Sequence, residues 1–219
     1  MNNHTESEEN YIKALYHLGG EGAVASGALA NRVGAKGPSA TQAVRRLASK
    51  GLVEVIPYKG VKLTLDGLIL AKHILRKHRL WETFLVEKLG FGWEEVHPIA
   101  EQLEHIQSRD LVEKLADYLD SPVHDPHGDP IPQADGRIPP ATGKPLQKFS
   151  QGSSLKVVRV EDAGTDFFTQ LDLLEISLGK EYTLTSVSSF DSSIQLQAED
   201  GESFWLSHSM SSNIYAISL

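Results

Sequence analysis

The sequence predicts an α+β multidomain protein with a winged helix-turn-helix, an all-α dimerisation domain and a small β-barrel. Apolar residues recur at helical spacing over most of the first 120 residues, and they alternate as in strands after residue 154. Between these parts, residues 121–150 contain 7 of the 10 prolines. We therefore expect domains at residues 1–75, 76–140 and 154–219, with a linker at 141–153.

The charge is divided unequally along the chain. The formal net charge is -8, yet residues 1–77 carry +5 and residues 78–219 carry -13. This asymmetry fits a basic head that reads nucleic acid, joined to an acidic body that can hold cations.

The composition excludes several classes of protein. No apolar run approaches the roughly 18 residues of a membrane span, and the polar start MNNHTESEEN is unlike a signal peptide. We therefore expect a cytoplasmic protein with no membrane partner. Because the chain has no cysteine, disulfides and thiolate zinc sites are excluded, and any metal must be bound by nitrogen and oxygen.

Two short helices followed by a basic hairpin predict a DNA-binding head. Helices are expected at 7–18, 26–33 and 38–49, and two strands flank Tyr58-Lys59-Gly60. Small polar side chains at the start of the third helix can reach base edges, while basic residues can neutralise phosphates. The alternative is a helix pair that binds no nucleic acid. The candidate DNA contacts are Lys36, Pro38, Ser39, Thr41, Gln42, Arg45, Arg46, Lys59 and Lys62.

Three further helices are expected at residues 64–89, 94–107 and 109–119. Their large apolar residues, among them Trp81 and Ile99, are more numerous than so short a segment can bury alone. We expect a second copy of the chain to cover them. The resulting homodimer would have the two-fold symmetry of a palindromic DNA site.

Imidazoles and carboxylates at helical spacing predict a metal site in this helical part. Glu101, Glu104 and His105 are spaced i, i+3 and i+4, and His78 precedes Glu82 by four residues. His97 lies one turn before Glu101. These donors suit Mn, Fe, Co, Ni or Zn better than a calcium cage. The alternative is a solvated helix face.

The proline-rich segment 121–150 is expected to be a linker or an extended arm. Four of its residues, His124, Asp125, His127 and Asp129, could bind a metal or form turns. Turn chemistry is the favoured role for His124 and Asp129, while Asp125 and His127 are open between turn chemistry and metal binding. After it, strands at 155–160, 182–187, 193–197 and 203–207 and a helix at 166–174 predict a barrel of about five strands.

The motifs SEENYIKALY, GPSATQAVRRL, HRLWETFLVEKLG, VHPIAEQLEH and HGDPIP give the chain a specific resemblance. In this order they resemble the diphtheria toxin repressor family, which includes the bacterial manganese transport regulators. The resemblance implies a winged-helix domain, a helical dimerisation domain and an SH3-like (FeoA-like) C-terminal domain. It also implies that metal binding allows operator binding and represses metal-uptake genes.

The resemblance also implies which residues bind metal. The family's ancillary site falls on His78, Glu82 and His97, and its primary site on Asn10, Glu101, Glu104 and His105. In some relatives a second site combines Glu82 with arm residues, here Asp125 and His127. The metal ligands that iron-type members have in the SH3-like domain fall on Gly164 and Phe167 of this chain, and neither side chain can bind a metal. Asp162 or Asp166 would have to substitute.

The metal expected from this ligand set is Mn²⁺. Glu101 stands where iron-type members have cysteine, and a carboxylate favours the harder ion. Fe²⁺ is the alternative, and Zn²⁺, Co²⁺ or Ni²⁺ would substitute in vitro. Asn10 departs from the aspartate or methionine of relatives, and Lys13 replaces a second acid of the manganese type.

The function expected is a metal-dependent repressor that binds a double-stranded DNA operator as a homodimer, with no small-molecule substrate. One alternative is a winged-helix regulator with vestigial metal sites, because of Asn10 and Lys13. The other is a metallohydrolase, but the sequence shows no nucleophile elbow and no phosphate-binding glycine loop. We therefore expect no enzyme.

Overall fold

The computed structural model describes residues 4–161 and 164–219, and it divides the chain into two compact units. The first unit holds the chain up to His78, together with Glu101–Glu113 and Pro132–Arg137. The second holds Arg79–Ala100, Lys114–Ile131 and Ile138–Leu219. Helix α4 (Leu65–Leu89) is continuous and passes from one unit to the other.

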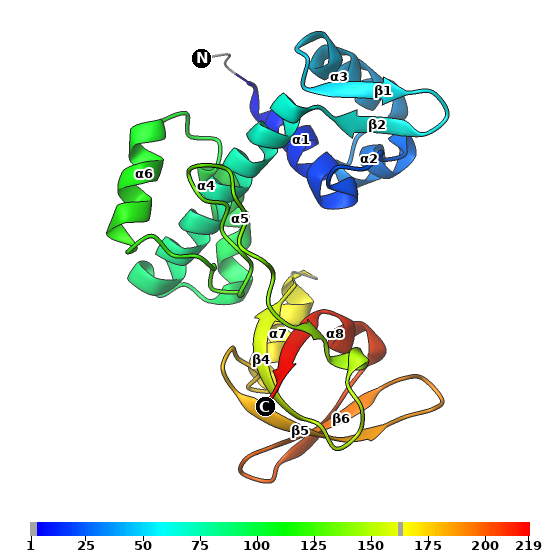
Figure 1. The fold of residues 1–219 in the computed structure, drawn as a ribbon, viewed down its shortest axis with the longest axis vertical. Coiled ribbons are helices and arrows are strands. Elements are labelled where there is room, and N and C mark those ends of the chain that lie inside the picture. Colours follow the sequence, from blue (N-terminus) through cyan, green and yellow to red (C-terminus); the bar gives the residue numbers. More distant parts are fainter. Residues whose placement is uncertain (1–3, 162–163) are drawn as a thin grey trace. The chain divides into compact units, whose positions relative to one another are not determined.

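The first unit contains the predicted winged helix-turn-helix (Figure 1). Its core is a cluster of apolar side chains in which Ile12, Leu15, Leu29 and Leu47 are fully buried. Strands β1 and β2 form an antiparallel hairpin beside the helices, with Val55 paired to Val61. The elements are α1 (Glu6–Gly19), α2 (Ser26–Arg32), α3 (Gly37–Ser49), β1 (Val53–Ile56) and β2 (Gly60–Leu63).

Local sequence signals explain where these elements begin and meet. The Thr5 hydroxyl accepts the Glu8 N–H at the start of α1, and the Glu8 carboxylate accepts the Thr5 N–H. The two hydrogen bonds form a capping box. Pro38 lies in the first turn of α3, where its missing N–H has no cost. Gly60 has a φ of 116°, and a Cβ there would lie 2.0 Å from the Val24 carbonyl oxygen. The hairpin can therefore approach Val24 closely only with glycine at this position.

Two further helices complete the helical part, α5 (Trp93–Leu103) and α6 (Arg109–Tyr118). Helix α5 is shorter than the expected 94–107, so Glu104 and His105 follow it in a turn. Ser108 accepts a hydrogen bond from the Leu111 N–H and so caps the start of α6.

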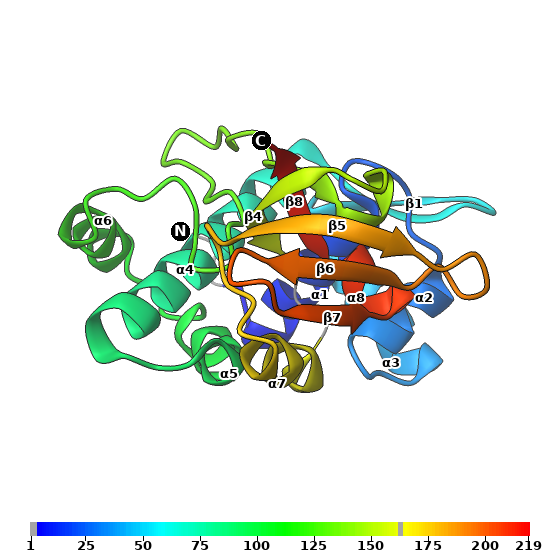
Figure 2. The same cartoon turned by 90° about the horizontal axis from the view of Figure 1, so that it is seen from below.

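The C-terminal part of the second unit is a six-stranded antiparallel sheet in the order β3-β8-β4-β5-β6-β7, in which β5, β6 and β7 lie side by side (Figure 2). The four expected strands and the expected helix are present. The elements are β3 (Lys144–Pro145), a 3-10 turn at Leu146–Lys148, β4 (Ser154–Val160), α7 (Thr165–Leu173), β5 (Glu181–Val187), β6 (Ile194–Ala198), β7 (Ser203–Leu206), α8 (His208–Ser212) and β8 (Ile214–Ser218).

Three elements of this part were not expected: β3, β8 and α8. Strand β3 and the 3-10 turn lie within residues 141–153, where the sequence predicts a linker. Leu146 and Phe149 from this segment are buried in the core of the sheet. Two apolar residues among prolines and glycines are too few to show a helical or strand period in the sequence. Among the described residues, no helix has the length and apolar character needed to cross a membrane.

Candidate metal centre

The arm residues Asp125 and His127 lie beside Glu82 of α4 in the second unit. All three side chains are buried, and one ligand atom from each lies within 4.8 Å of the others. Asp125 also shapes the arm, because its Oδ1 accepts the N–H groups of His127 at 2.9 Å and Asp129 at 3.0 Å. Asp125 therefore stabilises the turn of the arm with one carboxylate oxygen and also lies close to two other possible metal ligands.

The electrostatics of this group favour a bound cation. Burial raises the pKa of Asp125 well above its ordinary value, and the nearby Glu82 carboxylate raises it further. The Arg79 guanidinium opposes this rise, with its Nε 3.4 Å from Asp125 Oδ2. A divalent ion would stabilise both buried carboxylates, so oxygen donors and one imidazole fit a metal such as Mn²⁺ or Fe²⁺.

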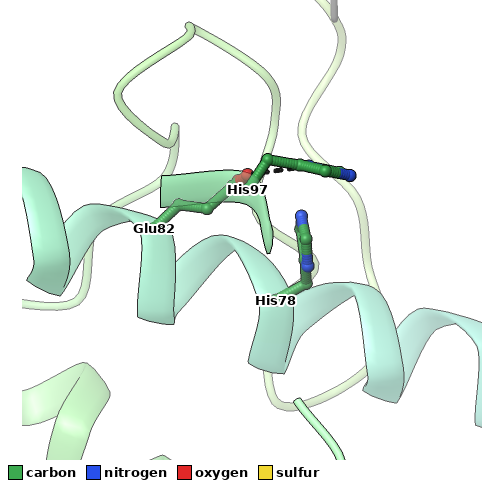
Figure 3. Close-up of side chains that lie close together, drawn as sticks. All are labelled: His78, Glu82 and His97. Carbon is green, nitrogen blue, oxygen red and sulfur yellow. Dashed lines mark hydrogen bonds and ion pairs between the residues drawn. The ribbon is translucent and has the colours of Figure 1, made fainter. Parts of the chain in front are cut away.

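Glu82 also lies close to two other imidazoles (Figure 3). His78 is one turn before it on α4, and His97 of α5 places its Nδ1 3.4 Å from Glu82 Oε1. Ligand atoms of these three residues lie within 4.8 Å of one another. His78 Nδ1 is 2.6 Å from Glu104 Oε2, so His78 would have to bind a metal through its Nε2.

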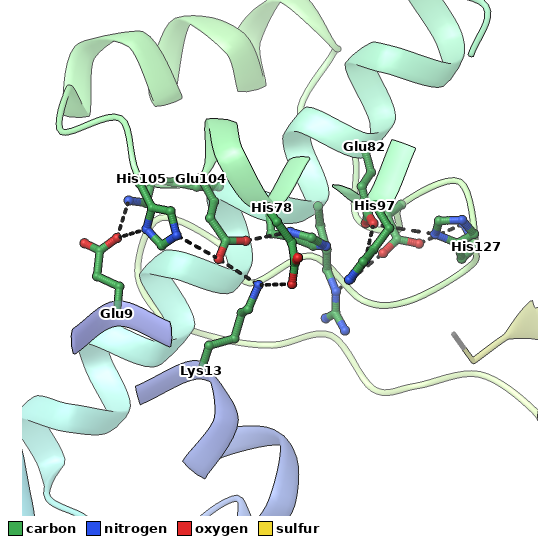
Figure 4. Close-up of polar contacts among 12 residues, drawn as sticks. Glu9, Lys13, His78, Glu82, His97, Glu104, His105 and His127 are labelled. Atoms are coloured by element: carbon green, nitrogen blue, oxygen red, sulfur yellow. Dashed lines mark hydrogen bonds and ion pairs between the residues drawn. The ribbon is translucent and has the colours of Figure 1, made fainter. Parts of the chain in front are cut away.

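The other expected ligands have different partners, as Figure 4 shows. Lys13 of α1 places its Nζ 2.7 Å from Glu104 Oε1 and 3.3 Å from Glu101 Oε1. Glu104 is fully buried. Burial alone would raise the pKa of Glu104, but the contacts with His78 and Lys13 outweigh burial and lower it. Glu104 is thus a charged, paired carboxylate.

His105 is bonded to α1 through Glu9 and not through Asn10. Its Nδ1 lies 2.6 Å from Glu9 Oε2, and Gln107 Nε2 donates to Glu9 Oε1 at 2.7 Å (Figure 4). Asn10 is half-buried, and its side chain forms no hydrogen bond within the described residues. Within residues 4–161 and 164–219, the groups of ligand atoms close enough for one ion both contain Glu82, and neither contains Glu101, Glu104 or His105.

Sequence reasoning missed several residues of these sites. Glu9 is almost fully buried, and only its place four residues before Lys13 on a capped helix indicated a shared face. Arg79 and Asp129 are 3.4 Å apart through Nη2 and Oδ2, so Asp129 does more than form a turn. His124 pairs with Pro130 in a short bridge within the arm. Asp166 is exposed on α7, and Asp162 lies outside the described residues.

The expected DNA contacts lie on two elements of the first unit. On α3 and just before it, the exposed candidates are Lys36, Pro38, Ser39, Thr41, Gln42, Arg45 and Arg46. Thr41 Oγ1 donates to the Gly37 carbonyl oxygen at 2.9 Å, so its hydroxyl proton is engaged. On the hairpin, Lys59 is exposed, whereas Lys62 is half-buried and opposite Glu54. The side chain across the ladder thus offsets part of the Lys62 charge.

A winged helix-turn-helix combined with buried carboxylate and imidazole groups defines a metal-regulated DNA-binding protein. The chain matches the model "Iron dependent repressor, N-terminal DNA binding domain" at residues 3–61, "Iron dependent repressor, metal binding and dimerisation domain" at 64–133 and "FeoA domain" at 144–217. It therefore belongs to the iron-dependent repressor family, whose members are transcriptional regulators and not enzymes.

Individual relatives agree with this family. The diphtheria toxin repressor of Corynebacterium diphtheriae is 30% identical over 192 residues, covering 83% of this chain and 85% of that protein. The iron-dependent repressor IdeR of Mycobacterium tuberculosis is 38% identical over 133 residues, covering 60% of this chain and 58% of that protein. A manganese-dependent transcriptional repressor in complex with manganese is 33% identical, with a TM-score of 0.88 and coverage of 97% and 100%. Both iron and manganese thus occur among the relatives.

Proposed function

We propose that this protein is a divalent-metal-dependent repressor that binds palindromic operators of metal-uptake genes as a homodimer, with Mn²⁺ favoured over Fe²⁺. The observation that carries this proposal is the group of buried, oxygen-rich ligands around Glu82 in a chain with a winged helix-turn-helix. A DNA-binding head alone would not require two buried carboxylates beside an imidazole.

The ligand chemistry supports Mn²⁺. Glu82 and Asp125 provide hard carboxylate oxygens, while His127 provides one imidazole. The chain contains no cysteine, so no thiolate is present to select a softer ion. A bound divalent ion would add positive charge beside the two buried carboxylates. His78 and His97 are the further proposed ligands, because their ligand atoms lie within 4.8 Å of the same Glu82 carboxylate.

The chain's own residues would connect this ion to the arm. Asp125 Oδ1 holds the backbone of residues 127–129, and the His127 carbonyl oxygen accepts the Val160 N–H at 2.8 Å. An ion held by Asp125 and His127 would therefore order the arm together with the end of β4. To activate DNA binding, the ion only has to bind more tightly to the DNA-competent state than to the incompetent state. Each difference of about 1.4 kcal/mol in binding free energy shifts the equilibrium between the two states tenfold.

A homodimer is supported by apolar side chains that remain exposed on the helical part. Leu89 at the end of α4 and Tyr118 at the end of α6 are both exposed, although both are large. Covering such residues by a second copy would give the two-fold symmetry that a palindromic site requires.

The test measures DNA binding of the full chain by fluorescence anisotropy, on a site selected from random DNA in the presence of Mn²⁺. We expect Asp125→Asn to lose most of the Mn²⁺ dependence, while the exposed Asp135→Asn keeps it. Asparagine retains the Oδ1 acceptor of the turn, so the arm can keep its shape. Metal-independent binding by the wild type would instead favour a regulator with vestigial metal sites. A selected site without two-fold symmetry would contradict the palindromic operator.

A further inference from the structure

Lys13 lies in the acidic cluster of Glu101 and Glu104, where the sequence predicts the primary metal site. Its side chain is only 13% exposed, and its ammonium group lies within 3.3 Å of carboxylate oxygens from both Glu101 and Glu104. A lysine on a helix ordinarily extends its charged end to water, because a buried ammonium has to be desolvated. Here the ammonium is turned inward and paired with two acids.

We propose that Lys13 is a built-in cation that takes the place of a divalent metal at Glu101 and Glu104. This cluster is therefore not a metal site in the wild-type protein, and the ion enters the group around Glu82 instead. The inference rests on the proposed function, since it names which of the two acidic groups takes the metal.

The charges of the cluster are satisfied without an ion. Glu104 is fully buried, and its two carboxylate oxygens contact Lys13 Nζ at 2.7 Å and His78 Nδ1 at 2.6 Å. Glu101 shares the same ammonium group at 3.3 Å. A divalent ion would have to displace Lys13 from both carboxylates or share them with a second cation a few ångströms away. Both routes weaken metal binding, because like charges repel strongly at this separation.

The same contacts attach α1 to residues 101–107 without a metal. Lys13 reaches Glu101 and Glu104, and Glu9, one turn earlier on α1, reaches His105 and Gln107. All of these residues belong to the first unit. In this protein, side-chain pairs that involve no metal ion thus connect the first helix to residues 101–107.

In the part of the chain that the structure describes, Glu82, Asp125 and His127 have ligand atoms within 4.8 Å of one another, whereas no such group includes Glu101 or Glu104. Glu82 and Asp125 are both buried, and the Arg79 Nε lies 3.4 Å from Asp125 Oδ2. The same guanidinium also pairs with Asp129, because Arg79 Nη2 lies 3.4 Å from Asp129 Oδ2. Asp129 also pairs with Arg159, whose Nη1 lies 3.0 Å from Asp129 Oδ1. The arrangement of the ligand atoms around Glu82 therefore favours this group as the place of the divalent ion.

The matched control for Lys13 is Lys50. Its Nζ lies 2.7 Å from Oε2 of Glu8, another buried glutamate of α1, and no candidate metal ligand is involved. Replacing either lysine by glutamine removes one ion pair to a buried acid. Only the change at Lys13 leaves a pair of carboxylates open to a metal.

The experiment measures Mn²⁺ binding to the full chain by equilibrium dialysis and calorimetry, without DNA. We expect Lys13→Glu to bind one more Mn²⁺ per chain than the wild type, and Lys13→Gln to gain the same site with weaker affinity. Lys50→Gln should keep the wild-type stoichiometry. In the wild type, Glu104→Gln should leave the number of bound ions unchanged, whereas in Lys13→Glu it should remove the additional ion. Circular dichroism checks that each variant is folded, and Lys13→Gln alone suffices if Lys13→Glu does not fold.

Two results would overturn the inference: equal Mn²⁺ stoichiometry in wild type and both Lys13 variants, or loss of a bound ion from the wild type on Glu104→Gln. These results are separate from a failure of the proposed function. If the wild type bound no Mn²⁺ but Lys13→Glu gained a site, the role of Lys13 would stand and the metal-dependent repressor would fall.

Discussion

His105 Nδ1 lies 2.6 Å from Oε2 of Glu9, across 96 residues of sequence. Because an ionised carboxylate only accepts hydrogen bonds, the imidazole nitrogen is the donor. Glu9 is almost fully buried, and the ammonium group of Lys77 is 3.8 Å away. This pair anchors α1 to the turn that follows α5, so it should contribute to stability in the absence of metal.

Glu9→Gln is expected to lower the free energy of unfolding by about 2 kcal/mol, because hydrogen bonds to a buried charge are lost. Urea unfolding of the metal-free chain, followed by circular dichroism, measures the change. Glu6→Gln is the matched control, since Glu6 is exposed in the same first turn of α1. Equal effects of the two substitutions would show that the Glu9–His105 bond does not stabilise the protein.

Stability should decrease at acidic pH through Glu8. Burial alone would raise the pKa of Glu8, but the Lys50 ammonium and the Thr5 N–H outweigh burial and lower it below 4.5. A carboxyl with a lowered folded-state pKa stabilises the protein above its unfolded-state pKa. This contribution is lost as the pH falls from about 4.5 through the lower folded-state pKa.

The measurement is the free energy of unfolding between pH 6 and pH 3 for the wild type and for Glu8→Gln. Above pH 5, the variant should be less stable by about 1 kcal/mol, the typical value of a helix cap. Toward pH 3 the two curves should converge. A constant difference over the whole range would mean that the charge of Glu8 is not responsible.

Much of the helical and strand content was predictable, because it follows from periods of apolar residues that local sequence displays. The buried stripe of Ile12 and Leu15 and the alternation along β5 are examples. Strand β8 has two buried residues, Ile214 and Ala216, and was missed because it pairs with β3 and β4, which are distant in sequence, and not across a short turn such as Asp200-Gly201. Helix α5 was predicted four residues too long, because the turn at Glu104 and His105 is held by contacts with His78 and Glu9 that the local sequence does not display.

The metal ligands were less predictable for a different reason. Spacing along a helix correctly indicates that His78 and Glu82 share a face, since the helix itself sets that distance. It does not indicate that Lys13, 88 residues before Glu101, would place its ammonium group between Glu101 and Glu104. Contacts between distant segments depend on packing, which a single sequence does not display.

Arg159 of β4 is expected to hold the arm in place. Its Nη1 lies 3.0 Å from Asp129 Oδ1, and its guanidinium carbon is 3.4 Å from the centre of the Tyr215 ring. Arg159→Met keeps much of the apolar stem but leaves Asp129 with one cation fewer. We expect a loss of about 2 kcal/mol in unfolding free energy and weaker Mn²⁺ binding.

The control for this prediction is Arg137→Met. Arg137 pairs with Asp135 where both side chains are largely exposed, so the loss should stay within about 0.5 kcal/mol. Thermal unfolding and Mn²⁺ calorimetry on the two variants give the comparison. If Arg159→Met binds Mn²⁺ as tightly as Arg137→Met, the arm does not need Arg159 to present its ligands.

Gln42 and Lys59 should affect DNA binding in different ways. Gln42 is exposed near the start of α3, where its amide can pair with a base edge, so Gln42→Ala should relax base preference. Lys59 is exposed on the hairpin, so Lys59→Ala should weaken binding to all sequences alike and reduce the salt dependence. Binding isotherms over operator variants at several salt concentrations separate the two. An equal loss on every variant for Gln42→Ala would contradict its role in base recognition.

Tyr58 at the tip of the hairpin combines an unfavourable backbone conformation with a fully exposed ring. Its φ is 64°, in the left-handed region, and its side chain is fully exposed. The turn is closed by the Lys59 N–H donating to the Ile56 carbonyl oxygen at 3.1 Å. Glycine or asparagine is the usual residue at such a position, and another L-residue costs about 1–2 kcal/mol. An exposed ring adds nothing to the core, so we expect the ring to contact DNA.

Tyr58→Asn should therefore change stability and DNA affinity in opposite directions. We expect the free energy of unfolding to rise by about 0.5–1 kcal/mol, because asparagine tolerates the left-handed region. Operator affinity should fall several-fold, because the ring no longer packs against the DNA backbone. Tyr58→Phe is the control, since it keeps both the ring and the strain and should change neither quantity much. Urea unfolding and anisotropy titrations measure the two effects, and unchanged operator affinity in Tyr58→Asn would show that the ring does not contact DNA.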